Sequence, residues 1–195
     1  EVEGGDLLWK GKRLFEDLGC YGCHDTLGFG EDKRRMIGPG LRNIKNKVGA
    51  RWITAWIKDP KGFRPTTLMP DFRLTEEEAQ AIAAYLWQHA DEKGIYEEMP
   101  AFDDEQLSQG DFLFEQMGCM ACHTYEKDAE RGFAPNLARI GEKINYGYLV
   151  EWIMNPQGKE PLTRMPSFRM SQERASLVAG YLIHKTGTGV PKEGL

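Results

Sequence analysis

The sequence lacks a long apolar run, and no window approaches the about 18 uninterrupted apolar residues of a membrane-spanning helix. It also lacks a basic start followed by a short apolar core, so we expect neither a membrane span nor a signal peptide in this chain. Charge of one sign is not in large excess, since 25 basic and 30 acidic residues give a formal net charge of −5. That balance disfavours bulk nucleic-acid binding, and 41% hydrophobic residues indicate ordinary globular cores.

Cysteine is scarce as well, and its four residues are not scattered. They form two Cys-x-x-Cys pairs, each followed at once by a histidine: Cys20, Cys23 and His24, then Cys119, Cys122 and His123. No cysteine is left over for another role.

Such a pair is compatible with four chemistries: c-type haem attachment, a zinc site, a thioredoxin-like redox pair or a structural disulfide. One zinc ion would most simply draw four ligands from both pairs, but the pairs lie 99 residues apart in separate repeats. A thioredoxin-like pair follows a strand in a βαβ unit, and strand signals are absent here. A disulfide inside so short a loop would stabilise little.

The contiguous histidine, present twice, is the attachment signature of c-type haem and favours that alternative. Two thiols one helical turn apart can reach two vinyl groups on one porphyrin edge, while the next side chain turns under the iron. We therefore interpret the four cysteines as thioether attachment points. His24 and His123 are then the proximal iron ligands.

The second half of the sequence repeats the first, which sets the architecture. At an offset of 99, residues 11–24 match residues 110–123 at 8 of 14 positions. At an offset of 96, residues 52–86 match residues 148–182 at 15 of 35 positions. The change of offset gives the first copy a longer loop after its histidine, and that loop carries a run of basic residues within positions 33–51.

Each copy predicts helices in the same order. Apolar residues recur at helical spacing over residues 6–18, and shorter helices are expected around residues 52–58 and 148–154, each ended by an Asp-Pro or Asn-Pro step. Thr75 with Glu78 predicts a capping box at the start of the closing helix of the first copy. The second copy has an arginine in place of that glutamate, so its cap should be weaker.

We predict an all-α protein of two tandem domains. Residues 1–95 form domain 1, residues 106–195 form domain 2, and the polar segment 96–105 is the linker. Domains this small usually need a staple such as a metal centre, and one covalently bound haem per domain would supply it.

The sixth iron ligand separates an electron carrier from a binding or catalytic haem. Each repeat offers a methionine in the same Pro-flanked loop, Met69 and Met165, which follow their histidines by 45 and 42 residues. A lone methionine is more often core filler, but recurrence in both irregular loops favours ligation. Other candidates remain: Met36, Met99, Met117, Met120, Met154, Met170, His89 and His184. A histidine at a helix end more often satisfies that helix terminus.

These features resemble the class I cytochrome c family, in a tandem arrangement like that of two-domain diheme cytochromes. The resemblance covers nearly all the chain: Gly-x-x-x-Phe before each Cys-x-x-Cys-His, then Pro-x-Leu, Trp-Ile, Met-Pro-x-Phe and a closing helix with Tyr-Leu. It implies that Gly11 and Phe15 pack near Tyr85, with Gly110 and Phe114 near Tyr181.

The resemblance also implies roles for residues around each haem. The carbonyls of Pro39 and Pro135 would accept the ring N–H of the two proximal histidines. Trp56 and Trp152 would cover a haem propionate or hydrogen-bond to it, with simple core packing as the alternative. Arg73 and Arg169 would pair with propionates, with plain surface charge as the alternative.

The sequence favours a one-electron carrier, not an enzyme, that shuttles electrons between donor and acceptor proteins outside the cytoplasm, in the periplasm or at the outer face of the cytoplasmic membrane. A diheme peroxidase needs an open iron position, and two intact methionine loops argue against it. A thiosulfate-oxidising diheme enzyme would need a cysteine ligand, which this chain lacks. A third alternative is the electron-entry domain or subunit of a larger membrane oxidoreductase of a respiratory chain. The basic run at residues 33–51 is a candidate patch for an acidic partner.

Overall fold

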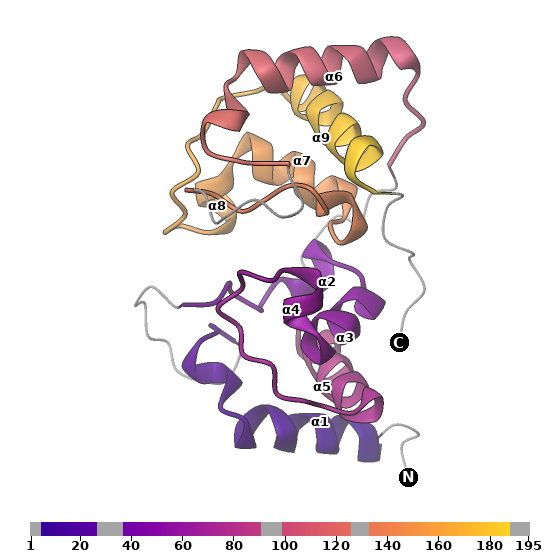
Figure 1. Ribbon diagram of the computed structural model, residues 1–195, viewed down its shortest axis with the longest axis vertical. Coiled ribbons are helices and arrows are strands. Elements are labelled where there is room, and N and C mark those ends of the chain that lie inside the picture. The colour runs from indigo at the N-terminus through magenta and orange to yellow at the C-terminus, as the bar shows by residue number, and fades with distance from the viewer. Residues whose placement is uncertain (1–4, 27–36, 91–98, 126–132, 188–195) are drawn as a thin grey trace. The chain divides into compact units, whose positions relative to one another are not determined.

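The chain folds into two helical units. The computed structural model describes residues 5–26, 37–90, 99–125 and 133–187. The described residues up to Ala90 belong to one compact unit and those from Met99 onward belong to another. Every regular element within these ranges is a helix, which confirms the all-α prediction (Figure 1).

The helices of the two units follow the same order. In the first unit they are α1 (Gly5–Asp17), the 3-10 turn η1 (Cys20–Gly22), α2 (Ile44–Lys47), α3 (Ala50–Lys58), α4 (Pro60–Phe63) and α5 (Glu76–His89). In the second unit they are α6 (Asp104–Gln116), the 3-10 turns η2 (Cys119–Ala121) and η3 (Ile140–Glu142), α7 (Tyr146–Met154), α8 (Pro156–Lys159) and α9 (Gln172–Thr186).

Helix α6 begins inside the segment 96–105 that the sequence assigns to the linker. Asp103 caps it, because its Oδ1 accepts from the Gln106 backbone N–H at 2.8 Å while Gln106 Oε1 accepts from the Asp103 N–H at 3.0 Å. Residues 96–98 lie outside the described ranges. The ordered helix therefore starts earlier than the apolar pattern indicates.

The first and last helices of each unit cross in contact, α1 on α5 and α6 on α9 (Figure 1). Glycine makes each crossing close. A Cβ atom built on Gly11 would lie 1.9 Å from the Ala81 carbonyl oxygen, and one on Gly110 would lie 2.3 Å from that of Leu177. The helix that leads into each Cys-x-x-Cys-His motif is thus fixed directly against the closing helix.

Aromatic rings pack against each other where α1 crosses α5 and where α6 crosses α9. Phe15 and Phe114 are both buried. The ring centroids of Phe15 and Tyr85 lie 5.6 Å apart, and those of Phe114 and Tyr181 lie 5.9 Å apart. These contacts confirm the packing that the resemblance implies. Each pair belongs to a hydrophobic core that also includes buried residues of α3 or α7.

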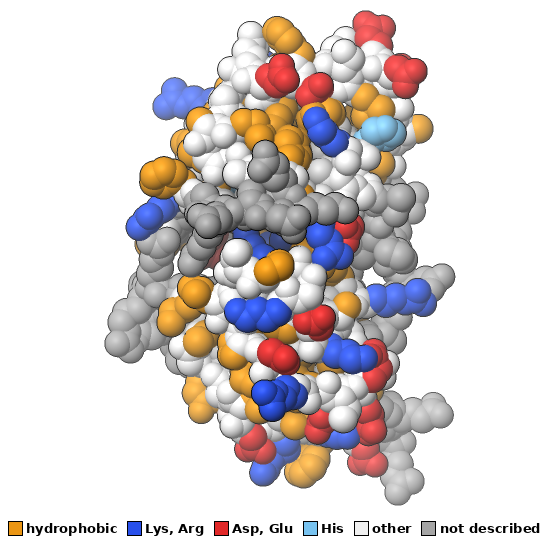
Figure 2. Space-filling view, viewed as in Figure 1, with side chains coloured by type: hydrophobic (Ala, Val, Ile, Leu, Met, Phe, Trp, Pro, Cys, Tyr) orange, Lys and Arg blue, Asp and Glu red, His pale blue; other side chains and the backbone are white. Residues whose placement is uncertain are grey.

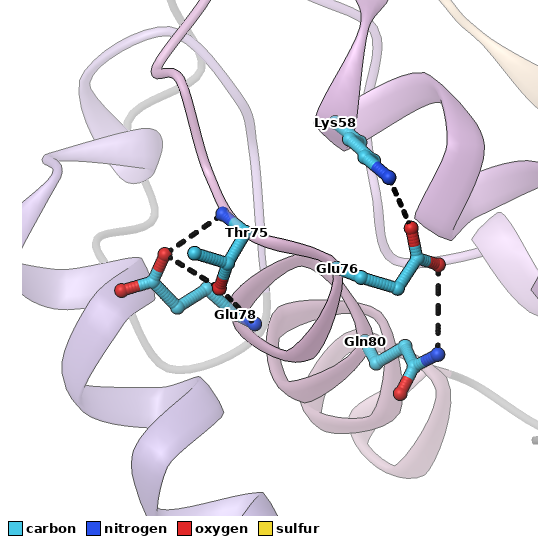
Figure 3. Close-up of polar contacts among 5 residues, drawn as sticks. All are labelled: Lys58, Thr75, Glu76, Glu78 and Gln80. Atoms are coloured by element: carbon cyan, nitrogen blue, oxygen red, sulfur yellow. Dashed lines mark hydrogen bonds and ion pairs between the residues drawn. The ribbon is translucent and has the colours of Figure 1, made fainter.

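Polar contacts fix the start of α5 (Figure 3). Thr75 Oγ1 accepts from the Glu78 N–H at 3.3 Å, and Glu78 Oε2 accepts from the Thr75 N–H at 2.9 Å. This confirms the predicted capping box. Lys58 at the end of α3 donates to Glu76 Oε2 at 2.5 Å, and Gln80 donates to the other oxygen of that carboxylate.

The corresponding start of α9 is weaker, as predicted. Ser171 Oγ accepts from the Arg174 N–H at 3.4 Å, and α9 carries no capping box because an arginine stands in the place of the glutamate. The two units therefore share one fold with different anchoring of the closing helix.

Candidate haem-binding sites

A glycine with a left-handed backbone conformation directly precedes each Cys-x-x-Cys-His motif. Gly19 and Gly118 both have φ of 68°, a conformation that ends the preceding helix and that other residues adopt at a cost. A Cβ at either position would meet nothing within 4 Å, so conformation rather than space requires glycine.

A single 3-10 turn follows each of these glycines; it begins at the first cysteine, and the second cysteine is its C-cap. The His24 N–H donates to the Cys20 carbonyl at 3.1 Å, and the His123 N–H donates to the Cys119 carbonyl at 3.0 Å. The histidine thus leaves the same tight turn as its cysteines. None of the four cysteines forms a disulfide.

Each histidine ring is oriented by a proline carbonyl. His24 Nδ1 lies 2.8 Å from the Pro39 oxygen, and His123 Nδ1 lies 2.7 Å from the Pro135 oxygen. A carbonyl oxygen can only accept, so the ring hydrogen sits on Nδ1 and the lone pair on Nε2 is left for a metal. The two contacts that the resemblance implies are therefore present.

The surroundings of His24 favour the neutral ring that metal ligation requires. Burial lowers the pKa of His24, the hydrogen bond to Pro39 opposes that shift, and the positive charge of Lys47 adds to it. Gly38 permits the close packing, because a Cβ there would lie 2.4 Å from His24 Cε1.

The methionine loops lie between the short helix α4 or α8 and the closing helix. Thr67 Oγ1 accepts from the Met69 N–H at 3.2 Å, and Thr163 Oγ1 accepts from the Met165 N–H at 3.3 Å. Both methionines are half-buried. In each unit a threonine hydroxyl two residues before the methionine therefore restrains the backbone conformation of the loop.

A second side-chain contact spans each loop from the short helix. Lys61 Nζ donates to the Thr67 carbonyl at 2.6 Å, and Gln157 Nε2 donates to the Met165 carbonyl at 2.6 Å. Different residues thus hold the same loop in the two units.

Arg73 and Arg169 end the methionine loops. They are the two described non-glycine residues with positive φ, 54° and 51°. The side chains of Asp71 and Ser167 accept from their N–H groups. Both arginines are exposed, and their pairing with propionates stays a prediction.

Trp56 and Trp152 point at the methionines. Trp56 Nε1 donates to Met69 Sδ at 2.8 Å, and Trp152 Nε1 donates to Met165 Sδ at 2.9 Å. The resemblance implies contact with a propionate, whereas the structure directs the indole N–H to sulfur. The sequence shows that a tryptophan is there but does not show which way its N–H points.

The competing ligand candidates have other surroundings. Met170 is buried in the core, and Met117 and Met154 pack against that core, while Met99 and Met120 are exposed. His89 Nδ1 lies 2.9 Å from the Tyr85 carbonyl, so this histidine satisfies a helix terminus as expected. His184 is exposed on α9, and Met36 lies outside the described residues.

Large apolar side chains close in sequence to the proposed ligands, such as His24 and Met69, are exposed. Ile37 is 72% exposed near His24, and Leu68 is 63% exposed beside Met69; in the second unit, Phe133 is 95% exposed and Leu162 53%. Figure 2 shows such apolar side chains among charged ones on the face it draws. Apolar side chains exposed at these positions are compatible with contact to an apolar group attached at the cysteines.

No group of three or more His, Cys, Asp or Glu side chains arranged for a metal ion occurs within the described part of the chain. The shared zinc site considered from the sequence would need such a group. Imidazole and thioether groups are ligands of haem iron, and the pairing of one of each at an iron in each unit stays a prediction.

Comparison with known proteins agrees with this chemistry. Residues 9–90 match the family model for cytochrome c, so this part of the chain is a cytochrome c domain. Such a domain implies covalently bound haem c with its iron.

Three relatives have similar sequences. Cytochrome c oxidase subunit 2 of Alkalihalophilus pseudofirmus is 32% identical over 89 residues, covering 41% of this chain and 25% of that protein. The C subunit of nitric oxide reductase from Stutzerimonas stutzeri is 30% identical over 92 residues, covering 44% of this chain and 60% of the relative. Its counterpart from Paracoccus denitrificans is 29% identical over 86 residues, covering 40% of this chain and 55% of the relative. The chain thus spans between a quarter and three fifths of these proteins.

Sequence reasoning missed the two threonines that hold the methionine loops. Thr67 and Thr163 occupy equivalent positions when the repeats are aligned at the offset of 96. That identity inside an irregular loop was the available signal.

Proposed function

We propose that the chain is a diheme c-type cytochrome that carries single electrons between redox proteins. The observation that carries this proposal is the repetition of one ligand arrangement: a histidine tied through Nδ1 to a proline carbonyl, and a methionine in a threonine-held loop. Haem c supplies the reversible one-electron change at iron. The protein supplies the attachment, the ligands and their orientation.

The proposed ligand pairs are His24 with Met69 and His123 with Met165. Two strong ligands leave no iron position for a substrate, so this arrangement supports a carrier rather than an enzyme. The thioether raises the reduction potential relative to two histidines. A shared ligand set places both haems in a broadly similar range of potential.

Haem number tests the proposal first. Haem per chain, measured from the alkaline pyridine spectrum against protein mass, is expected to be two. The Cys119→Ala/Cys122→Ala variant should retain one, and so should Cys20→Ala/Cys23→Ala. A wild-type value of one would contradict the diheme assignment, and a double-cysteine variant with two would contradict the attachment sites.

A second candidate function is an electron-transfer subunit or domain of a larger membrane oxidoreductase. The relatives named as subunits of cytochrome c oxidase and nitric oxide reductase favour it. No helix among the described residues is long and apolar enough to cross a membrane. Either role places the haems outside the cytoplasm, in the periplasm or at the outer membrane face. Copurification with a membrane-embedded partner from mild detergent extracts would separate this role from a free carrier.

A further inference from the structure

The indole-to-sulfur hydrogen bond occurs in both units and contacts the proposed iron ligand directly. Trp56 and Met69 are linked at 2.8 Å, and Trp152 and Met165 at 2.9 Å. In each unit the tryptophan lies on α3 or α7 and the methionine lies in the loop that follows α4 or α8, so the donor and the acceptor come from separate elements.

Different neighbours hold the two indoles in place. Trp56 stacks on Trp52 with ring centroids 5.2 Å apart and planes at 21°, and the edge of Phe63 meets both rings. Trp152 stacks on Tyr148 at 6.2 Å and 17°.

The lysine that replaces Phe63 in the second unit, Lys159, places its ammonium 5.7 Å from the centre of the Tyr148 ring. The surroundings of the two indoles therefore differ in chemistry. The same N–H to sulfur bond forms in both, so the bond does not depend on one particular set of neighbours.

The methionine backbone does not depend on the indole. Thr67 and Lys61 hold the first loop, and Thr163 and Gln157 hold the second. Removal of the indole N–H would therefore leave the loop anchored. The contact acts on the sulfur atom, not on the fold.

We infer that Trp56 and Trp152 are positioning residues that raise the reduction potential of each haem through this bond to the methionine sulfur. The inference rests on the proposed ligation by Met69 and Met165. An N–H donor withdraws electron density from the thioether, which then donates less to iron and favours the ferrous state. The same bond restrains the sulfur to one orientation.

The test uses the holoprotein with Trp56→Phe and Trp152→Phe, each made separately. Phenylalanine keeps an aromatic ring for the stack but removes the N–H. At a fixed ambient potential, the ferrous-to-ferric ratio of the altered haem should fall about three- to tenfold, which is about 30 to 60 mV at about 59 mV per tenfold for one electron. The haem of the other unit should not change.

Trp52→Phe is the matched control, because Trp52 stacks on Trp56 while the bond to sulfur comes from Trp56 itself. In the Trp52→Phe variant, the reduction potential of the haem in the first unit should remain at the wild-type value. An unchanged potential in both tryptophan-to-phenylalanine variants would overturn the inference, and so would an equal shift in Trp52→Phe. Should one variant fail to fold, the other unit supplies the same test.

The far-red band of the thioether-to-iron bond separates this inference from the proposed ligation. If Met69→Ala loses its share of that band while Trp56→Phe leaves the potential unchanged, the inference fails and the ligation stands. If Met69→Ala keeps the full band, the ligation itself fails.

Discussion

Gly11 and Ala81 approach so closely that a Cβ atom at residue 11 would lie 1.9 Å from the Ala81 carbonyl oxygen. The nearest atoms are backbone, which cannot rotate away. We expect Gly11→Ala to force α1 off α5 and to lower the free energy of unfolding by about 2 to 3 kcal/mol. Urea unfolding of the holoprotein measures this change.

Gly5→Ala is the control for that variant. Residue 5 lies in the same helix, and a Cβ there would meet nothing within 4 Å. Because alanine favours helices more than glycine does, this change should be neutral or stabilise by up to about 1 kcal/mol. Equal destabilisation by both variants would show that the close helix crossing does not account for the effect, since helix propensity alone favours alanine.

Replacing one methionine should open one iron. Met69→Ala and Met165→Ala each remove one thioether, so each should lower one reduction potential and admit an added ligand such as imidazole. The far-red thioether-to-iron band of the ferric protein should fall to about half in each variant and vanish in the double variant, since each iron contributes one such bond. A band at full intensity in both single variants would rule out these ligands.

The start of α5 should respond to acid more than the start of α9. Hydrogen bonds from Thr75 lower the pKa of Glu78 below 4.5, and Lys58 does the same for Glu76. A carboxylate whose pKa is lowered in the folded state stabilises that state above its unfolded pKa, and this contribution is lost as the pH falls through the folded value.

Hydrogen exchange read by mass spectrometry can follow both helices at once. Protection of α5 should fall as the pH drops below 4.5, more steeply than that of α9, where Gln172 and Arg174 replace the two glutamates. Glu78→Gln should flatten the α5 profile. Parallel profiles for α5 and α9 in the wild-type protein would contradict this explanation.

The basic run should steer an acidic partner. Lys33 and Arg34 lie outside the described residues, while Arg42 forms an ion pair with Asp25 at 2.9 Å. The rate of electron transfer to an acidic acceptor should fall with ionic strength, since salt screens charges beyond about 10 Å at 0.1 M.

A Lys33→Glu/Arg34→Glu variant should transfer several-fold more slowly at low salt, with the difference shrinking at high salt. Arg174→Glu, an exposed position in the second unit, is the charge control. A salt-independent wild-type rate would remove the basis for this surface.

The elements that sequence could predict are those specified by local pattern. Thr75 and Glu78 lie three residues apart in one short motif, so the capping box could be predicted. Helix α4 was missed because four residues show no periodicity. Asp59 and Pro60 end α3, as predicted, but Asp59 also caps a further turn with Pro60 at its first position.

The direction of a side chain was harder to predict than its position. The self-alignment identified Trp56 and Met69 as equivalent to Trp152 and Met165, but it carries no information on indole orientation. That orientation depends on how α3 packs beside the loop, which is a tertiary property. The proline carbonyl contacts came from the resemblance, because no local pattern links residue 24 to residue 39.

The close crossing of α1 on α5 also bears on the order in which a domain can mature during synthesis. The helix that leads into the Cys-x-x-Cys-His turn obtains its packing surface only from residues made much later, since Gly11 meets Ala81. Contacts so distant in sequence form late and slowly. A nascent chain that stops before α5 would lack the surface on which α1 packs, so the turn that carries Cys20 would follow an unsupported helix.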